Sequence, residues 1–136
     1  MTDITKSPYS MSTPVDLEYN EAVRRVSALL KEEGFGILST IDIQHTLKEK
    51  IDLDREPYVI LGACNPDFAS EALAAEPEVG VLLPCNVIVY QQDGDTHVSI
   101  MDPAAAMELT GNERIRQIAS EIRPKLERVL IELTRD

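Results

Sequence analysis

The chain has few of the residues that nucleic-acid, sugar and membrane surfaces use. It contains no tryptophan, and aromatic residues make up only 4% of its 136 positions, so extended stacking surfaces for bases or sugars are not expected. Lysine and arginine number 13 against 24 aspartates and glutamates, which gives this acidic chain a formal charge of −11. Nucleic acids and anionic membranes attract clustered positive charge, so neither is an expected partner.

Long apolar segments and export signals are also missing. No apolar run approaches the roughly 18 residues of a membrane span, and the first dozen residues lack the basic patch and apolar stretch of a secretion signal. The only two cysteines, Cys64 and Cys85, are too few for a secreted disulfide framework. We therefore expect a cytoplasmic protein with reduced thiols.

Familiar catalytic and metal motifs are absent as well. No glycine-rich loop is followed by a lysine and a serine or threonine, which disfavours nucleotide hydrolysis. The glutamates lack the paired spacing of a glycosidase or an oxygen-ligated metal site. Zinc-type cysteine spacings are missing, and His45 and His97 fall where histidines are usually solvated. We assign no metal, no cofactor and no catalytic residue, and the balance is against an enzyme unless a thiol is reactive.

What is present is the periodicity of one α+β domain of about 9–136, preceded by a flexible tail of residues 1–8. Helical spacing of apolar residues predicts helices from Glu18 to Gly34 and from Asn112 to the C-terminus. Alternation over 35–42 predicts a strand, and Asp93-Gly94 predicts a hairpin turn. The expected order is strand, helix, strand, short helix, strand, helix, two strands, helix. This order is typical of helices packed in layers on a largely antiparallel sheet.

Two prolines predict interruptions of regular secondary structure. Pro84 interrupts the apolar region 79–90, so a bulge or tight break is expected between two strand-like runs. Pro124 lies inside the final helix and removes one backbone hydrogen bond, so a kink is expected near 120–123.

Two cysteine-bearing turns make the candidate site. In the first, Cys64 comes just before a predicted helix, where Asn65 is a favoured N-cap and Pro66 a favoured first residue. Amide groups and the positive dipole end at such a helix start favour a thiolate. The second turn contains Pro84, Cys85 and Asn86. The structural alternatives are also strong, because free cysteines often fill space in the core and the two asparagines suit a cap and a break.

Three functions are compatible with these turns. The favoured one is a homodimeric binding or regulatory module whose site, made of Cys64, Asn65, Pro66, Pro84, Cys85 and Asn86, takes a small anionic or thiol-containing ligand. The second is a thiol-dependent redox protein or enzyme, in which Cys64 attacks and Cys85 resolves, provided that their Cα atoms lie within about 7 Å. The third is a structural interaction domain with inert, buried thiols.

Five segments together carry a resemblance to a known family. They are Gly34 to Leu38, Gly62 to Pro66, Pro77 to Gly80, Leu82 to Val87 and Asp102-Pro103. In this order and spacing the chain, from about Tyr9 to Leu133, resembles the bacterial and archaeal family called domain of unknown function 302. The resemblance implies a compact α+β domain, often a homodimer, in a family with no established activity.

Overall fold

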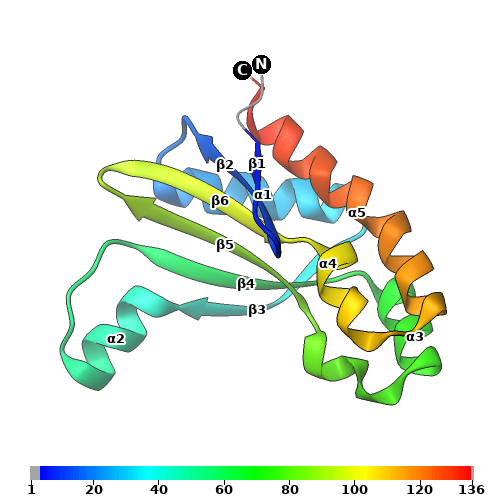
Figure 1. The fold of residues 1–136 in the computed structure, drawn as a ribbon. Helices are drawn as coiled ribbons and strands as arrows, with labels where there is room; N and C mark the ends of the chain where they lie inside the picture. The colour runs from blue at the N-terminus through cyan, green and yellow to red at the C-terminus, as the bar shows by residue number, and fades with distance from the viewer. Residues whose placement is uncertain (1–3, 136) are drawn as a thin grey trace.

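The computed structural model describes residues 4–135 of the chain, and within them six strands form one antiparallel sheet (Figure 1). The strands are β1 (Thr5–Lys6), β2 (Ser10–Val15), β3 (Gly36–Asp42), β4 (Tyr58–Cys64), β5 (Cys85–Gln92) and β6 (Asp95–Met101). Their order across the sheet is β1-β2-β6-β5-β4-β3, with every neighbouring pair antiparallel. The predicted α+β class is thereby confirmed.

Two long helices cover one face of the sheet. The α-helices are α1 (Tyr19–Glu32), α2 (Ile43–Ile51), α3 (Pro66–Ala75), α4 (Pro103–Met107) and α5 (Glu113–Leu133), with 3-10 helices η1 (Pro77–Leu82) and η2 (Glu108–Thr110). Helix α1 packs against β5 and β6, and α5 packs against α1, α3, α4 and β2. None of the helices within 4–135 is both long and apolar enough to span a bilayer.

The long helices begin and end at residues suited to these roles. The Asn112 side chain accepts hydrogen bonds from the amides of Arg114 and Ile115, which satisfies two donors at the start of α5. Gly34 follows α1 with a φ of +89°, a conformation that costs glycine little and lets the chain turn into β3. The sequence signals for both helices are confirmed.

The core lies between the sheet and the α1–α5 layer. Alternate strand residues point into it, among them Val59, Leu61 and Ala63 of β4 and Val87 and Val89 of β5, all 5% exposed or less. They meet the apolar stripes of α1 and α5. Within the described residues, the opposite face of the sheet has no such helical layer in front of it, which leaves its side chains half-buried or exposed (Figure 1).

Local structure departs from the sequence prediction in a few places. The strand-like run before Pro84 is the 3-10 helix η1, in which the amide of Val79 donates to the carbonyl of Glu76 and that of Leu83 to the carbonyl of Gly80. Strand β5 begins directly after Pro84, since proline has no amide for a sheet ladder. The final helix, by contrast, runs through Pro124 as predicted.

The predicted tail 1–8 contributes to the sheet, because Thr5 and Lys6 pair with Ser12 and Met11 of β2. Residues 1–3 of that tail and residue 136 lie outside the described part of the chain.

Candidate functional site

Cys64 ends β4 at the point where α3 begins. The amide of Phe68 donates to Asn65 Oδ1 at 3.1 Å, and Pro66 is the first residue of the helix, so the predicted cap is confirmed. Cys64 itself is half-buried. The thiol therefore lies at a strand end beside the start of a helix, as the sequence predicts.

Cys85 is the first residue of β5 and is buried, with 2% of its surface exposed. It pairs with Ala63 across the sheet, and both side chains belong to the core. Because successive strand residues point to opposite faces, the register directs Cys64 toward the other face. The two cysteines are thus neighbours in the sheet, and both thiols are free.

Burial controls the chemistry of the second thiol. Desolvation, with a smaller contribution from the nearby Cys64, raises the pKa of Cys85 from 9.0 to about 12. A thiol with such a pKa stays protonated at neutral pH and is a poor nucleophile and a poor metal ligand.

A cavity of about 270 Å³, which we call the cysteine pocket, opens beside these turns. Residues of β3, β4, α3 and the segment before β5 line it: Leu38, Ala63, Cys64, Asn65, Phe68, Ala69, Leu73, Leu83, Pro84 and Cys85. Four of the six predicted site residues meet here. Pro66 is exposed outside the pocket, and Asn86 lies on the open face of the sheet.

Most of the pocket wall was not identified from the sequence. Phe68, Ala69 and Leu73 come from α3 and Leu38 from β3, and no sequence pattern marks them as site residues. In the structure Leu38 and Leu73 remain 70% and 44% exposed although they are apolar. Leu38 lies at an irregularity of the β3–β4 register, between Ile37 and Ser39. Such an irregularity redirects a side chain, which period-two reasoning does not predict.

Gly62 lets Pro84 and Ser39 pack closely over β4. A Cβ at this position would lie 2.9 Å from Pro84 Cγ and would also collide with Ser39 Oγ. A glycine inside a strand often marks such a close approach. The position of Pro84, and with it one wall of the cysteine pocket, depends on this missing side chain.

The pocket lining contains no charged side chain. Both histidines are engaged elsewhere: His45 Nε2 lies 2.8 Å from a Glu49 carboxylate oxygen on α2, and His97 stacks on Tyr90. Among residues 4–135, no three histidine, cysteine or acidic side chains are grouped to hold a metal ion. The chemistry at this pocket is therefore that of an apolar surface with one accessible thiol.

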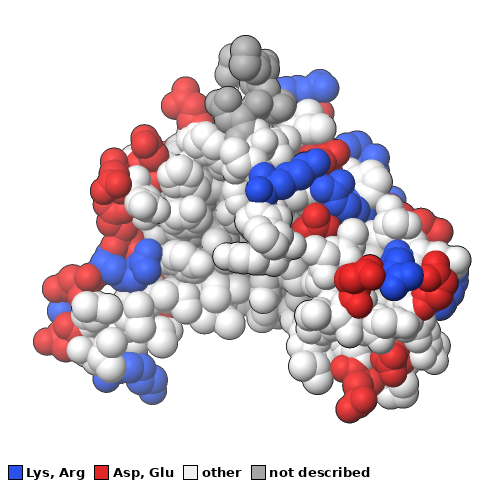
Figure 2. All heavy atoms as spheres, viewed as in Figure 1, with Lys and Arg blue, Asp and Glu red and all other residues white. Residues whose placement is uncertain are grey.

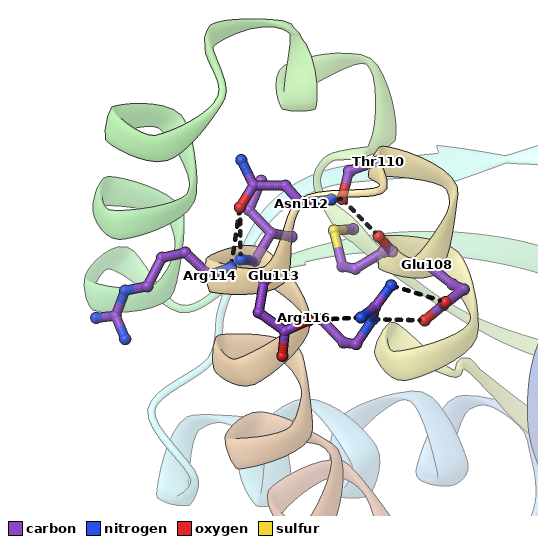
Figure 3. A network of polar contacts seen from close by, with 8 residues as sticks. Glu108, Thr110, Asn112, Glu113, Arg114 and Arg116 are labelled. Atoms are coloured by element: carbon purple, nitrogen blue, oxygen red, sulfur yellow. Dashed lines mark hydrogen bonds and ion pairs between the residues drawn. The ribbon is translucent and has the colours of Figure 1, made fainter.

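Helix α3 is tied to the start of α5. Asn112 Nδ2 donates to the carbonyl of Ala75 at 3.5 Å, and Arg114 pairs with Glu71 at 3.3 Å. Two residues further on, Arg116 binds acidic groups of η2 and of its own helix (Figure 3). These contacts hold α3, which lines the pocket, against the start of α5.

The difference between the two thiols can be measured directly. We expect Ellman's reagent to modify one thiol per folded chain rapidly, and the second at least about a hundredfold more slowly, because Cys85 reacts only when the structure opens. Cys64→Ser should abolish the fast phase, whereas Cys85→Ser should leave it. Two fast thiols in the folded wild-type protein would contradict the burial of Cys85.

Comparisons with known proteins agree with this architecture. Residues 11–133 match the family model described as "Domain of unknown function DUF302". One similar solved structure is that of an uncharacterized conserved DUF302 protein from Bacillus stearothermophilus, with 32% sequence identity and a TM-score of 0.86 over 95% of this chain and 100% of that chain. No curated protein matches the sequence. The family match and the shared fold show that the chain belongs to the DUF302 family.

Proposed function

We propose that this domain is a homodimeric binding or regulatory module whose ligand site is the cysteine pocket. The observation that carries the proposal is the pocket itself, which brings Cys64, Asn65, Pro84 and Cys85 to one apolar cavity at a strand end. Its volume of about 270 Å³ lies near the lower end of small-molecule sites, so the ligand is small.

The lining favours a thiol-containing ligand over an inorganic anion. No lysine, arginine or histidine lines the pocket, and the whole chain carries a formal charge of −11. The Phe68 amide at the start of α3 already donates a hydrogen bond to Asn65 Oδ1, so this amide is not available to bind an anion. An uncharged organic thiol could place its apolar part between Leu38 and Leu73 and its sulfur near Cys64.

A pocket-filling substitution tests this proposal. Ala69 lines the pocket on α3, and Ala74 is exposed on the same helix outside it. We expect 1-propanethiol, in the presence of a phosphine reductant, to raise the melting temperature of the wild-type and Ala74→Leu proteins, whereas Ala69→Leu should not respond. Inorganic phosphate should give no shift. Equal responses of Ala69→Leu and Ala74→Leu, or a larger response to phosphate, would contradict the proposal.

The dimer is proposed to form through the β3–α2 surface, which we define as Leu38, Ile41, Ile51 and Leu53. Each of these side chains is at least 46% exposed. Strand β3 is an edge of the sheet, and α2 has no fully buried residue. Exposed apolar side chains beside a free strand edge are typical of association surfaces. Because Leu38 also lines the pocket, a second copy would lie beside the ligand.

Charge placed on this surface should separate the copies. We expect Ile41→Lys to change the sedimentation mass from dimer to monomer, because a desolvated lysine at an apolar interface has no partner. Val81→Lys, at an 87% exposed residue of η1, should remain dimeric. A wild-type protein that is monomeric over all concentrations would refute the dimer without affecting the ligand test.

A further inference from the structure

A second, larger cavity lies on the open face of the sheet, away from the cysteine pocket. It measures about 550 Å³ and we call it the sheet-face groove. Its residues are Pro8, Tyr9, Ser10, Tyr58, Asn86, Ile88, Ser99, Ile100, Met101, Ala105, Ala106 and Leu109. The β1–β2 hairpin forms one wall, α4 and η2 form the other, and β5 and β6 form the floor.

The walls of the groove are unusually apolar for exposed positions. Tyr9 on the hairpin is 71% exposed and Leu109 on η2 is 78% exposed, although both are large and apolar. Between these walls, Ile88 of β5 lies opposite Ser99 of β6. Asn86 precedes Ile88 by two residues on β5. Two projecting walls above a floor make a cleft, whereas a protein-docking surface needs a broader face of about 800 Å² per partner. The shape therefore favours a small molecule.

The groove contains no charged side chain. Figure 2 shows an uncharged surface across the lower centre of the view, with charged side chains to both sides and above it. No cation lines the groove, although the Arg55 guanidinium lies 4.9 Å from the centre of the Tyr58 ring, and an anionic ligand would be repelled by the net charge of −11. A cationic ligand would find no carboxylate in the lining. The occupant that fits is uncharged.

Polar groups in the groove are hydroxyls and one amide. Burial raises the pKa of Tyr58; the nearby Arg55 charge partly opposes this shift, and Tyr90 and Tyr9 make smaller contributions that raise it, so the Tyr58 phenol remains a hydrogen-bond donor. Ser99 Oγ lies on the floor, 2.6 Å from Ser12 Oγ. The α4 wall, by contrast, presents Ala105, Ala106 and Leu109. The groove thus offers hydroxyl groups on the hairpin and strand side and an apolar surface on the helix side.

We propose that the sheet-face groove binds an uncharged, elongated amphipathic small molecule, such as a medium-chain alcohol. Its apolar chain lies along Met101, Ala106 and Leu109, and its hydroxyl or carbonyl group meets Tyr9 and Tyr58. Neither the family match nor the cysteine pocket assigns a role to this face of the sheet.

The test uses the neutral fluorescent probe N-phenyl-1-naphthylamine with the full chain. We expect the probe to bind and 1-decanol to displace it at a concentration about tenfold lower than decanoate or decylammonium, because a charge in this uncharged groove loses hydration without gaining a partner. Equal or better displacement by either charged homologue would overturn the proposal.

Two exposed positions provide a matched pair of variants. Leu109→Arg places a charge on the groove wall and should raise the dissociation constant of the probe about fivefold or more. Val81→Arg makes the same change at an exposed 3-10 position outside the groove and should alter it by less than about twofold. Because both side chains are exposed, neither change is expected to unfold the domain. Equal effects of the two variants would refute the site.

Two further measurements test where 1-decanol binds and whether a second copy of the chain covers the sheet-face groove. Amide chemical-shift changes on adding 1-decanol should centre on Ser99, Met101 and Ala106; changes centred on Phe68 and Ala69 would assign binding to the cysteine pocket and overturn the proposal. If probe affinity falls as the protein self-associates, and Leu109→Arg is monomeric, a second copy covers the groove and the proposal is wrong.

Discussion

Above pH 9 the wild-type domain should lose stability faster than its Cys85→Ala variant, by about 1.4 kcal/mol of unfolding free energy per pH unit. The folded chain holds the thiol protonated, because burial raises its pKa from 9.0 to about 12. Between these two values the unfolded chain has released the proton and the folded chain has not. Unfolding therefore becomes easier as pH rises, and the contribution of this thiol is complete below pH 9 and lost by about pH 12.

The accumulated difference approaches about 4 kcal/mol by pH 12. It is measured by urea unfolding of both proteins at pH 7, 9, 10 and 11 with reductant present. Raised pKa values of Tyr19 and Tyr58 affect both proteins equally and cancel in the comparison. Cys64→Ala is the matched control and should keep most of the slope, because burial is the larger cause of the shift. Parallel stability curves for wild type and Cys85→Ala would refute the assignment.

The same protonation bears on redox chemistry at the two cysteine turns. A resolving thiol must ionise before it attacks, and Cys85 stays protonated at neutral pH while its side chain lies in the core. A cycle that used Cys85 would therefore require the start of β5 to open. The binding proposal needs no such motion, which is why it is the better supported of the two.

Gly62→Val should destabilise the domain by about 2–3 kcal/mol. Even a single Cβ at this position would lie 2.9 Å from Pro84 Cγ and would collide with Ser39 Oγ. Valine adds two methyl groups, so Pro84 must move away from β4. Because Pro84 is also a wall of the cysteine pocket, the variant should lose the melting-temperature response to 1-propanethiol as well. Chemical denaturation and the thermal-shift assay measure the two effects.

Gly36 provides the control for this substitution. It lies on the neighbouring strand β3, opposite Cys64, and a Cβ there would have nothing within 4 Å. We expect Gly36→Val to change stability by less than about 0.5 kcal/mol. Adding Ser39→Ala to Gly62→Val should restore part of the lost stability, since it removes one of the two colliding atoms. Similar losses for Gly62→Val and Gly36→Val would show that close packing is not the cause.

Local patterns in the sequence predicted much of the candidate site. Asn65 followed by Pro66 predicted the start of α3, and the apolar run from Tyr58 to Leu61 predicted β4, because helix caps and apolar runs depend on neighbouring residues. The run before Pro84 was misassigned for the same reason: apolar residues such as Val79 and Val81 suit a strand, yet without a partner strand the segment forms η1. Short apolar runs do not distinguish these outcomes.

By itself, the sequence determined the family, the class of fold, the order of its main elements and the two turns at which the thiols lie, since each depends on residues close together in the chain. Only the tertiary structure decided which thiol is buried, that Leu38 and Leu73 complete a pocket around Cys64, and that Asn86 belongs to a separate groove with Tyr9 and Leu109. These features arise from the register of β4 on β5 and from the helices covering only one face of the sheet. Both depend on contacts between residues distant in the sequence, which no local pattern specifies.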